Sequence, residues 1–325
     1  MREYSVDSTA AGMSLIKYLN RVLPSAPSSL LYAQLRKKNI NLNRKKAKGT
    51  EKLNAEDKIQ VYFSDETIAK FSGGSDAGVD ASFSKAGYED IDFSDITVLY
   101  ENDDIIAIDK PAGVLSQSDE PGGISLNEKL IAFLLNRKAV SMESLGVFKP
   151  SVCNRLDRNT SGIVLCSKTL KGARFLGEEL KERSADKYYE CIVMGHFDKD
   201  GIRENYLTKD EAANQVKISD KPVSEASVSI ATGYECIDTM KTQAGEISLV
   251  RAKLITGKSH QIRAQLSYLG HPITGDPKYG DPKFNREMKK IYGTNRQLLH
   301  AKKVVLSDGT VIESKLPEDF IKVIG

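Results

Sequence analysis

The 325-residue sequence has no tryptophan, only four histidines and four cysteines, and no apolar run close to the ~18 residues that a membrane span needs. Its first ten residues, MREYSVDSTA, lack the order of cationic, apolar and small residues that marks a secretory signal. These absences favour a soluble protein of the cytoplasm. The length is enough for roughly two domains, each with a core of its own.

The cysteines and histidines are spaced in ways that do not favour metal sites or disulfides. No CxxC pair occurs, and three of the cysteines lie in apolar, strand-like runs, so we expect buried, reduced thiols. The histidines show neither HxxxH nor HExxH spacing, so we expect no metal site. The residues concerned are Cys153, Cys166, Cys191, Cys236, His196, His260, His271 and His300.

Nucleotide-binding motifs are also missing. The chain has no GxGxxG after a strand and no GxxxxGK[ST], which argues against NAD and ATP, and we expect no cofactor. The 44 acidic residues offer many carboxylate pairs, but no motif selects a pair for glycoside hydrolysis.

Charge is distributed unevenly along the chain. Residues 1–63 hold twelve Lys or Arg against five Asp or Glu, whereas residues 64–97 hold two Lys against eight acidic residues. The second segment includes the small-residue stretch Gly73-Gly74-Ser75-Asp76. We therefore expect a basic domain at 1–63 that binds a polyanion, an acidic linker at 64–95 and a larger domain at 96–325.

The basic segment is expected to hold two helices and a small hairpin. Ser14 is placed to cap a helix that Pro24 ends, and a second helix from Ser29 runs into Arg36-Lys37-Lys38. Short strands then flank Arg44-Lys45-Lys46, and residues 58–63 read as a strand. A charge run alone is more often a solvated surface. This order of elements, however, resembles the small RNA-binding domain first recognised in a small-subunit ribosomal protein, across residues 12–63.

The larger region is rich in hairpins. Strands are expected at 96–100, 105–108, 187–195, 225–232, 247–255 and 302–314, and the last folds back at Asp308-Gly309. Ser125 and Glu128 form a capping box for one helix, and Thr169 is placed to cap another. Because no regular strand-helix-strand alternation occurs, we predict an α+β fold with a mixed, mainly antiparallel sheet and not a doubly wound one.

Residues 151–168, SVCNRLDRNTSGIVLCSK, place a lone carboxylate, Asp157, between Arg155 and Arg158. Both cations, and backbone amides of the following Thr160-Ser161-Gly162 turn, favour its charged form. An ionised carboxylate suits a nucleophile or a base better than a proton donor. Without its context, such an Asp more often caps a turn.

Residues 256–263, TGKSHQIR, form a second chemically dense segment. Ser259 is expected to cap a helix that ends at Gly270, with His260 and Arg263 on its outward face. Lys258, Arg263 and the helix dipole then make an anion site. Taken singly, Arg263 could instead pair with a surface carboxylate, and His260 could serve in capping or packing.

Four segments in order resemble the RluA-type pseudouridine synthase family: ENDDIIAIDKPAG, NRLDRNTSGIVL, KYYECIVMG and TGKSHQIRAQLSYLGHPITGDPKYG. The resemblance covers most of residues 96–315. With the basic N-terminal domain, the chain looks like the two-domain branch that modifies large-subunit ribosomal RNA. The family often has His where this chain has Asn154, a difference that bears on how the loop is held and not on the nucleophile.

The resemblance implies that uridine is converted to pseudouridine: the N-glycosidic bond breaks, the uracil turns, and C5 joins C1′, with no cofactor. Asp157 matches the catalytic aspartate, which attacks the ribose or removes its 2′ proton; both routes stay open. Arg263 matches its basic partner, and Arg155 the residue that fills the space left by the flipped base. Tyr189 matches the tyrosine that stacks on the uracil and helps to remove its C5 proton, whereas neighbouring Tyr188 is the better candidate for a core tyrosine.

The expected partner is RNA of the large-subunit, 23S type, with transfer RNA as an alternative. We expect the protein to be a monomer and to have no membrane partner. A non-catalytic ribosome-assembly factor on the same fold is the alternative function. The expected RNA contacts are Lys110, Arg158, Lys187, Lys258, His260, Arg36, Lys37, Lys38, Arg44, Lys45 and Lys46.

Overall fold

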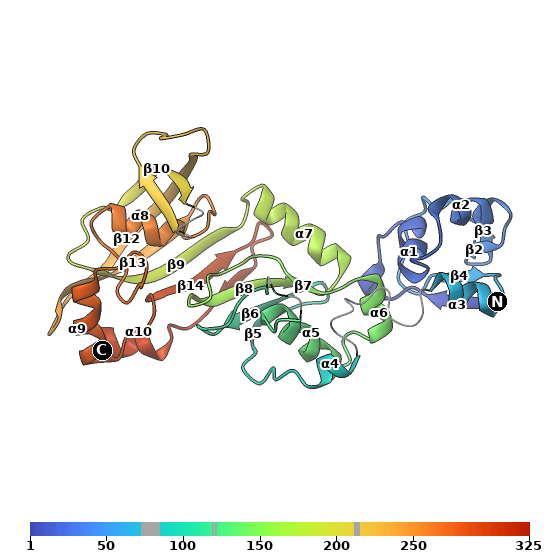
Figure 1. Cartoon of the computed structure of the whole chain (residues 1–325), viewed down its shortest axis with the longest axis horizontal. Coiled ribbons are helices and arrows are strands. Elements are labelled where there is room, and N and C mark those ends of the chain that lie inside the picture. Colours follow the sequence, from blue (N-terminus) through green and yellow to red (C-terminus); the bar gives the residue numbers. More distant parts are fainter. Residues whose placement is uncertain (73–84, 119, 121, 211–214) are drawn as a thin grey trace. The chain divides into compact units, whose positions relative to one another are not determined.

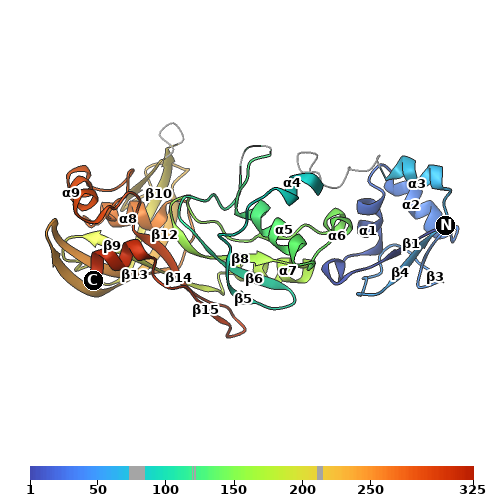
Figure 2. The same cartoon turned by 90° about the horizontal axis from the view of Figure 1, so that it is seen from below.

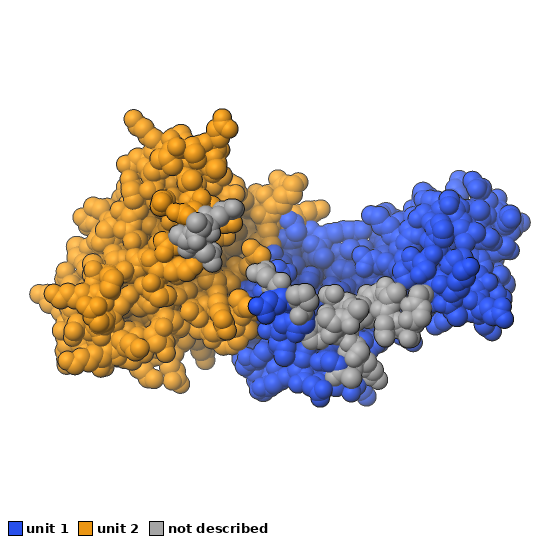
Figure 3. All heavy atoms as spheres, in the orientation of Figure 1, with its two compact units in different colours: residues 1–107, 116–154, 165–177 blue, residues 108–115, 155–164, 178–325 orange. Residues whose placement is uncertain are grey.

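The computed structural model describes residues 1–72, 85–118, 120, 122–210 and 215–325. It divides into two compact units, which Figure 3 colours separately. The first unit comprises residues 1–107, 116–154 and 165–177, and the second comprises residues 108–115, 155–164 and 178–325. Among the described residues, no helix has both the length and the apolar character needed to cross a membrane.

The N-terminal part of the first unit is a four-stranded sheet with helices on one side (Figure 2). The sheet order is β1-β4-β2-β3, and buried leucines of the helices, such as Leu19 and Leu35, pack with Ile59 of the sheet. The elements are β1 (Arg2–Ser5), a 3-10 turn (Ser8–Ala10), α1 (Leu15–Val22), α2 (Ser28–Arg36), β2 (Ile40–Leu42), β3 (Lys45–Lys46), β4 (Lys58–Val61) and α3 (Asp65–Phe71).

The two expected helices and the hairpin are present, with small differences at the caps. Ser14 occupies the N-cap position of α1 but makes no side-chain capping hydrogen bond, and α2 begins at Ser28, one residue early. Asn43 and Arg44, at the turn between β2 and β3, both have positive φ, as a tight hairpin turn of this kind requires. The six predicted basic contacts of this domain are exposed.

The expected linker begins with helix α3. Ser64 is its N-cap, and the Ser64 side chain accepts a hydrogen bond from the Thr67 amide. At the other end of the helix, Phe71 packs edge-on against Phe63, with ring centroids 6.4 Å apart. The stretch that prompted the linker prediction, Gly73-Gly74-Ser75-Asp76, lies outside the described residues. The domain boundaries at 63 and 95 stay a prediction.

The rest of the first unit contains the predicted hairpin and helices. Its elements are α4 (Lys85–Glu89), β5 (Thr97–Glu101), β6 (Ile105–Lys110), α5 (Leu126–Asn136), α6 (Met142–Val147), β7 (Ser151–Val152) and α7 (Leu170–Lys181). The capping box of Ser125 and Glu128 is confirmed at the start of α5. Val147 and Leu170 pack into the core of the N-terminal sheet and helices, so this part of the unit has one continuous apolar core. Strand β6, helix α7 and strand β8 (Ser161–Ser167) contribute residues to both units.

The second unit is built on a large sheet (Figure 1). Its strands follow the order β11-β10-β12-β13-β9-β14-β8, and every neighbouring pair is antiparallel except β14 with β8. The predicted mixed, mainly antiparallel sheet is therefore confirmed. Its further elements are β9 (Asp186–Met194), β10 (Gly201–Asp210), β11 (Gln215–Ser219), β12 (Val228–Thr242), β13 (Gly245–Leu254), α8 (Gln261–Tyr268), α9 (Pro282–Tyr292), β14 (Leu299–Val305), β15 (Val311–Glu313) and α10 (Glu318–Ile324).

The two faces of this sheet carry different helices. Ile192 on β9 and Leu249 on β13 lie opposite each other and pack against Met288 of α9 and Phe320 of α10. Tyr189 is three residues before Ile192, and since alternate residues of a strand face opposite ways, it lies on the other face. Helix α8 packs on that other face: Tyr189 is paired with Ala252 of β13, Ala252 is paired with Tyr234 of β12, and Tyr234 Oη donates to Gln265 of α8 at 3.0 Å.

Candidate active site

Asp157 lies in the loop that joins β7 to β8, and hydrogen bonds hold the loop backbone at Asp157 and at the residue after it. The Thr160 amide donates to the Asp157 carbonyl at 3.0 Å. Arg158 and Gly113 exchange two hydrogen bonds: the Gly113 amide donates to the Arg158 carbonyl at 2.8 Å, and Arg158 Nε donates to the Gly113 carbonyl at 3.0 Å. The Asp157 side chain keeps 28% of its surface exposed, so the carboxylate is held in place but open to a substrate.

Lys110 is fully buried and supports the same loop through its side chain. Its ammonium donates to the carbonyls of Pro111 at 3.0 Å, Val114 at 2.8 Å and Arg158 at 3.1 Å. Burial, with help from Arg296, lowers the pKa of Lys110 to about 7, against the opposing charge of Asp157. The prediction that Lys110 contacts phosphate is wrong in this structure, because all three of its donors are used inside the protein.

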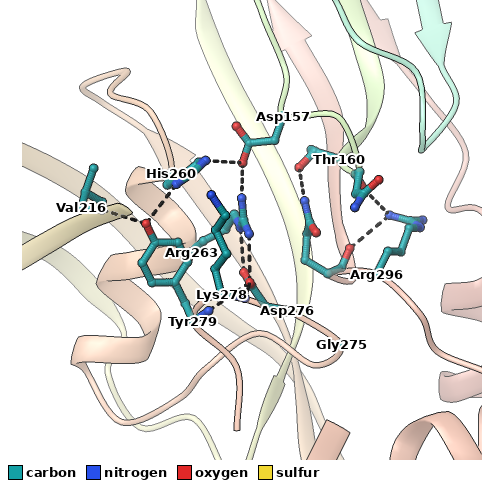
Figure 4. A network of polar contacts seen from close by, with 12 residues as sticks. Asp157, Thr160, Val216, His260, Arg263, Gly275, Asp276, Lys278, Tyr279 and Arg296 are labelled. Atoms are coloured by element: carbon teal, nitrogen blue, oxygen red, sulfur yellow. Dashed lines mark hydrogen bonds and ion pairs between the residues drawn. The ribbon is translucent and has the colours of Figure 1, made fainter. Parts of the chain in front are cut away.

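Arg263 is the partner of Asp157. Its Nη1 donates to Asp157 Oδ2 at 2.7 Å, while Nε and Nη2 form a bidentate pair with the two carboxylate oxygens of Asp276 at 2.6 and 2.9 Å (Figure 4). The guanidinium is 5% exposed, so the expected outward face of this helix is in fact buried against the site. Burial alone would lower the pKa of Arg263, but its pairs with Asp276 and Asp157 raise it further than burial lowers it.

Sequence reasoning missed Asp276, although it lies in the quoted segment GDPKYG. Its side chain is completely buried and also accepts hydrogen bonds from the amides of Lys278 at 2.9 Å and Tyr279 at 3.1 Å. Both oxygens of this buried carboxylate therefore accept hydrogen bonds, two of them from the guanidinium of Arg263. Asp276 therefore neutralises most of the Arg263 charge and fixes the direction in which Arg263 meets Asp157.

His260, and not Ser259, occupies the N-cap position of α8, so the predicted Ser259 cap is wrong. The residue has a left-handed backbone, with φ of 56°, and makes no side-chain capping hydrogen bond. Its Nε2 is 3.9 Å from Asp157 Oδ2, and its Nδ1 is 2.9 Å from Tyr279 Oη. Burial lowers the pKa of His260 and Arg263 lowers it further, while Asp157 acts in the opposite direction.

Tyr189 lies on the face of the sheet that α8 covers and is 8% exposed. Its cross-strand neighbours are Ala252 on one side and Ala301 on the other, so small side chains flank the ring. Burial raises the pKa of its hydroxyl, and the charge of Asp157 raises it further, which places the two side chains within electrostatic reach. Tyr188 is partly exposed, so the prediction that it, rather than Tyr189, is the core tyrosine is wrong.

The remaining predicted residues of the second unit differ in exposure. Arg155, Arg158 and Lys258 are exposed and so accessible to RNA, whereas Lys187 is only partly exposed and burial lowers its pKa. The structure thus brings together Asp157, Arg263, His260 and Tyr189, and their proposed roles stay predictions.

Within the described ranges, no group of three His, Cys, Asp or Glu side chains is arranged to hold a metal ion. All four cysteines are free; Cys166 and Cys191 are buried, whereas the other two are only partly buried.

Comparison with known proteins gives a consistent result. Residues 104–268 match the RNA pseudouridylate synthase family. The ribosomal large subunit pseudouridine synthase C of Pasteurella multocida is 30% identical over 308 residues, which cover 91% of this chain and 83% of that protein. The protein of the same name from Vibrio cholerae is 29% identical over 302 residues, which cover 91% and 85%.

Solved structures show the same fold. The human RNA pseudouridylate synthase domain containing 4 protein aligns with a TM-score of 0.56 and 21% identity over 70% of this chain and 91% of that chain. The human domain containing 1 protein also aligns with a TM-score of 0.56, at 22% identity over 72% and 88%. With a family match over half of its length and the predicted RluA-type segments in order, this chain belongs to the RNA pseudouridylate synthase family and is an RNA pseudouridine synthase.

Proposed function

We propose that this enzyme isomerises uridines of large-subunit ribosomal RNA, with Asp157 as the reacting carboxylate. The observation that carries the proposal is the pairing of a partly exposed carboxylate with a buried arginine whose charge a second carboxylate already balances. The names of the relatives from Pasteurella multocida and Vibrio cholerae support the substrate. A monomer acting in the cytoplasm, away from membranes, is part of the same proposal.

The electrostatics of the pair suit both chemical routes. Asp157 must be ionised to attack ribose C1′ or to remove the 2′ proton, and Arg263 donates one hydrogen bond to its carboxylate. During either step Asp157 loses its charge. Because Asp276 continues to balance Arg263, the loss does not leave a buried cation without a partner. Arg263 can therefore orient Asp157 without a large electrostatic cost when the Asp157 charge is lost.

The other proposed roles concern the RNA. A uridine inside a helix must be flipped out, at an unstacking cost of a few kcal/mol. The exposed guanidinium of Arg155 fills the space that the base leaves. The Tyr189 ring stacks on the uracil and helps to remove its C5 proton. Lys187, Lys258 and Arg158 contact phosphates near the site. The domain at 1–63, followed by a linker at 64–95, docks RNA through its two exposed basic clusters, and residues 96–325 form the catalytic domain.

The test uses RNA tritiated at uridine C5, because forming pseudouridine releases that tritium. Asp157→Asn should abolish release from large-subunit ribosomal RNA while RNA affinity, measured by filter binding, stays within about twofold of the wild type, since the shape of the side chain is kept. Asp198→Asn, at a carboxylate that is 57% exposed and lies outside the site, is the matched control and should retain activity. Tritium release by Asp157→Asn at the wild-type rate would overturn the assignment of Asp157.

A second arm tests the substrate. Wild-type enzyme should release tritium from large-subunit ribosomal RNA and not from transfer RNA. Release from transfer RNA alone would change the substrate, and binding without release from either RNA would favour a non-catalytic assembly factor.

A further inference from the structure

The imidazole of His260 connects the reacting carboxylate to a chain of hydrogen bonds that ends at a strand. The Val216 amide of β11 donates to Tyr279 Oη at 2.9 Å, and the same oxygen is 2.9 Å from His260 Nδ1. The two rings meet edge to face, with centroids 5.6 Å apart. On its other side, His260 Nε2 faces Asp157 Oδ2 (Figure 4).

This chain of contacts favours one tautomer of His260. Tyr279 Oη accepts from the Val216 amide, which leaves its O–H to donate to His260 Nδ1. A neutral imidazole that accepts at Nδ1 carries its hydrogen on Nε2. The N–H of His260 therefore points toward Asp157.

The surroundings of His260 favour this neutral form. Burial, Arg263 and Lys278 lower its pKa, and the carboxylates of Asp157 and Asp276 oppose them without reversing the shift. At neutral pH the ring thus presents an uncharged donor to Asp157, not a second cation.

We propose that His260, oriented by Tyr279, is a positioning residue for Asp157 that donates from Nε2 to Oδ2 and so leaves Oδ1 as the oxygen that reacts with the ribose. Arg263 already donates to Oδ2, and within the described part of the chain no group donates a hydrogen bond to Oδ1. The inference rests on the proposed role of Asp157. It replaces the predicted contact between His260 and RNA phosphate.

The distance fits an enzyme without its substrate. At 3.9 Å, His260 Nε2 is about 0.7 Å beyond hydrogen-bond range of Asp157, and such contacts often tighten only in the substrate complex. The two residues that contact His260 and Asp157 share one anchor. Asp276 accepts hydrogen bonds from the Tyr279 amide and from Arg263, so one buried carboxylate positions both residues.

The backbone of His260 sets the direction of its ring. Its conformation is left-handed, with φ of 56°. A helical or extended backbone at this position would direct the ring elsewhere.

Steady-state tritium release from large-subunit ribosomal RNA separates positioning from binding. His260→Ala should lower kcat by about 10–100-fold, the range for residues that orient a reacting group, with KM within about twofold. His260→Gln should recover part of kcat because its amide supplies an N–H donor, and Tyr279→Phe should lower kcat less than His260→Ala. The matched control His196→Ala, at an exposed histidine of the same unit, should match the wild type. A raised KM at unchanged kcat in His260→Ala would overturn the inference and restore the phosphate contact.

A second measurement does not depend on activity. In the full-length enzyme labelled with ¹⁵N, long-range ¹H–¹⁵N correlation spectra should show His260 in the tautomer protonated at Nε2, and Tyr279→Phe should reduce that preference. An Nδ1-protonated ring in the wild type would refute the inference. If the wild type does not act on ribosomal RNA, the proposed substrate fails, whereas this spectrum still decides the tautomer.

Discussion

Asn154, which stands where the RluA-type family often has His, should hold the start of the loop that carries Asp157 through a hydrogen bond to β8. Strands β7 and β8 pair at Val152 and Cys166, and the Cys153 amide continues the ladder by donating to the Leu165 carbonyl at 2.7 Å. The Leu165 amide then donates to Asn154 Oδ1, also at 2.7 Å. The side chain thus extends the ladder by one hydrogen bond at the point where the chain leaves it.

The magnitude follows from the burial of the donor. Leu165 is 1% exposed, so Asn154→Ala leaves a buried amide without its acceptor, at a cost of about 1–3 kcal/mol. A histidine at position 154 offers a ring nitrogen that can accept from the same amide, so Asn154→His should cost less than about 1 kcal/mol. The same loss of loop order should lower kcat in Asn154→Ala and leave Asn154→His close to the wild type.

Hydrogen exchange of the Leu165 amide measures this bond directly. Its protection should fall by about 10–100-fold in Asn154→Ala, which corresponds to about 1.4–2.7 kcal/mol, and should stay within about fivefold in Asn154→His. Tritium release from RNA supplies the parallel activity measurement. Equal losses of protection in the two variants, or unchanged protection in Asn154→Ala, would refute the argument that an acceptor at position 154 holds the loop.

Four further results are expected. Asp276→Asn keeps the shape but removes the charge that balances buried Arg263, and should lower the free energy of unfolding by about 3 kcal/mol in urea titrations; a loss below about 1 kcal/mol would contradict this. Because burial lowers the pKa of Lys110 from 10.5 to about 7, its contribution to the free energy of unfolding should be fully present above pH 10.5 and lost as pH falls toward 7; Lys110→Met, followed by urea titration across this range, should lack that dependence. Burial and Asp157 raise the pKa of Tyr189, so its hydroxyl should stay protonated between pH 6 and 9. The pH–rate profiles of the wild type and of Tyr189→Phe should therefore have the same shape over this range. Replacing exposed Arg44, Lys45 and Lys46 together by Ala should reduce the salt slope of RNA binding by about 2 if each meets one phosphate, and an unchanged slope would exclude them as contacts.

Local signals in the sequence predicted those elements whose ends are set by a few neighbouring residues. Pro24 limits α1, Ser125 and Glu128 begin α5, and the turn after Glu101 joins β5 to β6. Strand β10 was missed because its sequence, GIRENYLTKD, mixes charged and apolar side chains in a run that a surface loop would also fit. Strand β1 was missed because its pairing with β4 joins residues far apart in sequence, such as Arg2 and Val61.

The candidate site divides in the same way. The charges beside Asp157 in the sequence drew attention to it, but its pairing with Arg263 was expected only from the family resemblance, because the neighbours of Arg263 also fit a pair with a surface carboxylate. The roles of Lys110 and Asp276 do not follow, since a lysine after a strand and an aspartate in a glycine-rich turn are ordinarily exposed. Burial decides both: the same lysine that would bind phosphate on a surface becomes a support for a loop when three carbonyls surround it.

The geometry also explains why the partner of Asp157 is an arginine. The guanidinium presents its donors in a fixed plane, so that Nε and Nη2 bind Asp276 while Nη1 binds Asp157. A lysine ammonium has no such fork and would approach one carboxylate at the expense of the other. Arg263→Lys should therefore keep the positive charge yet lose the fixed orientation of Asp157. The contacts of Asp157 thus depend less on the presence of a neighbouring cation than on the direction of that cation, which the buried carboxylate of Asp276 determines.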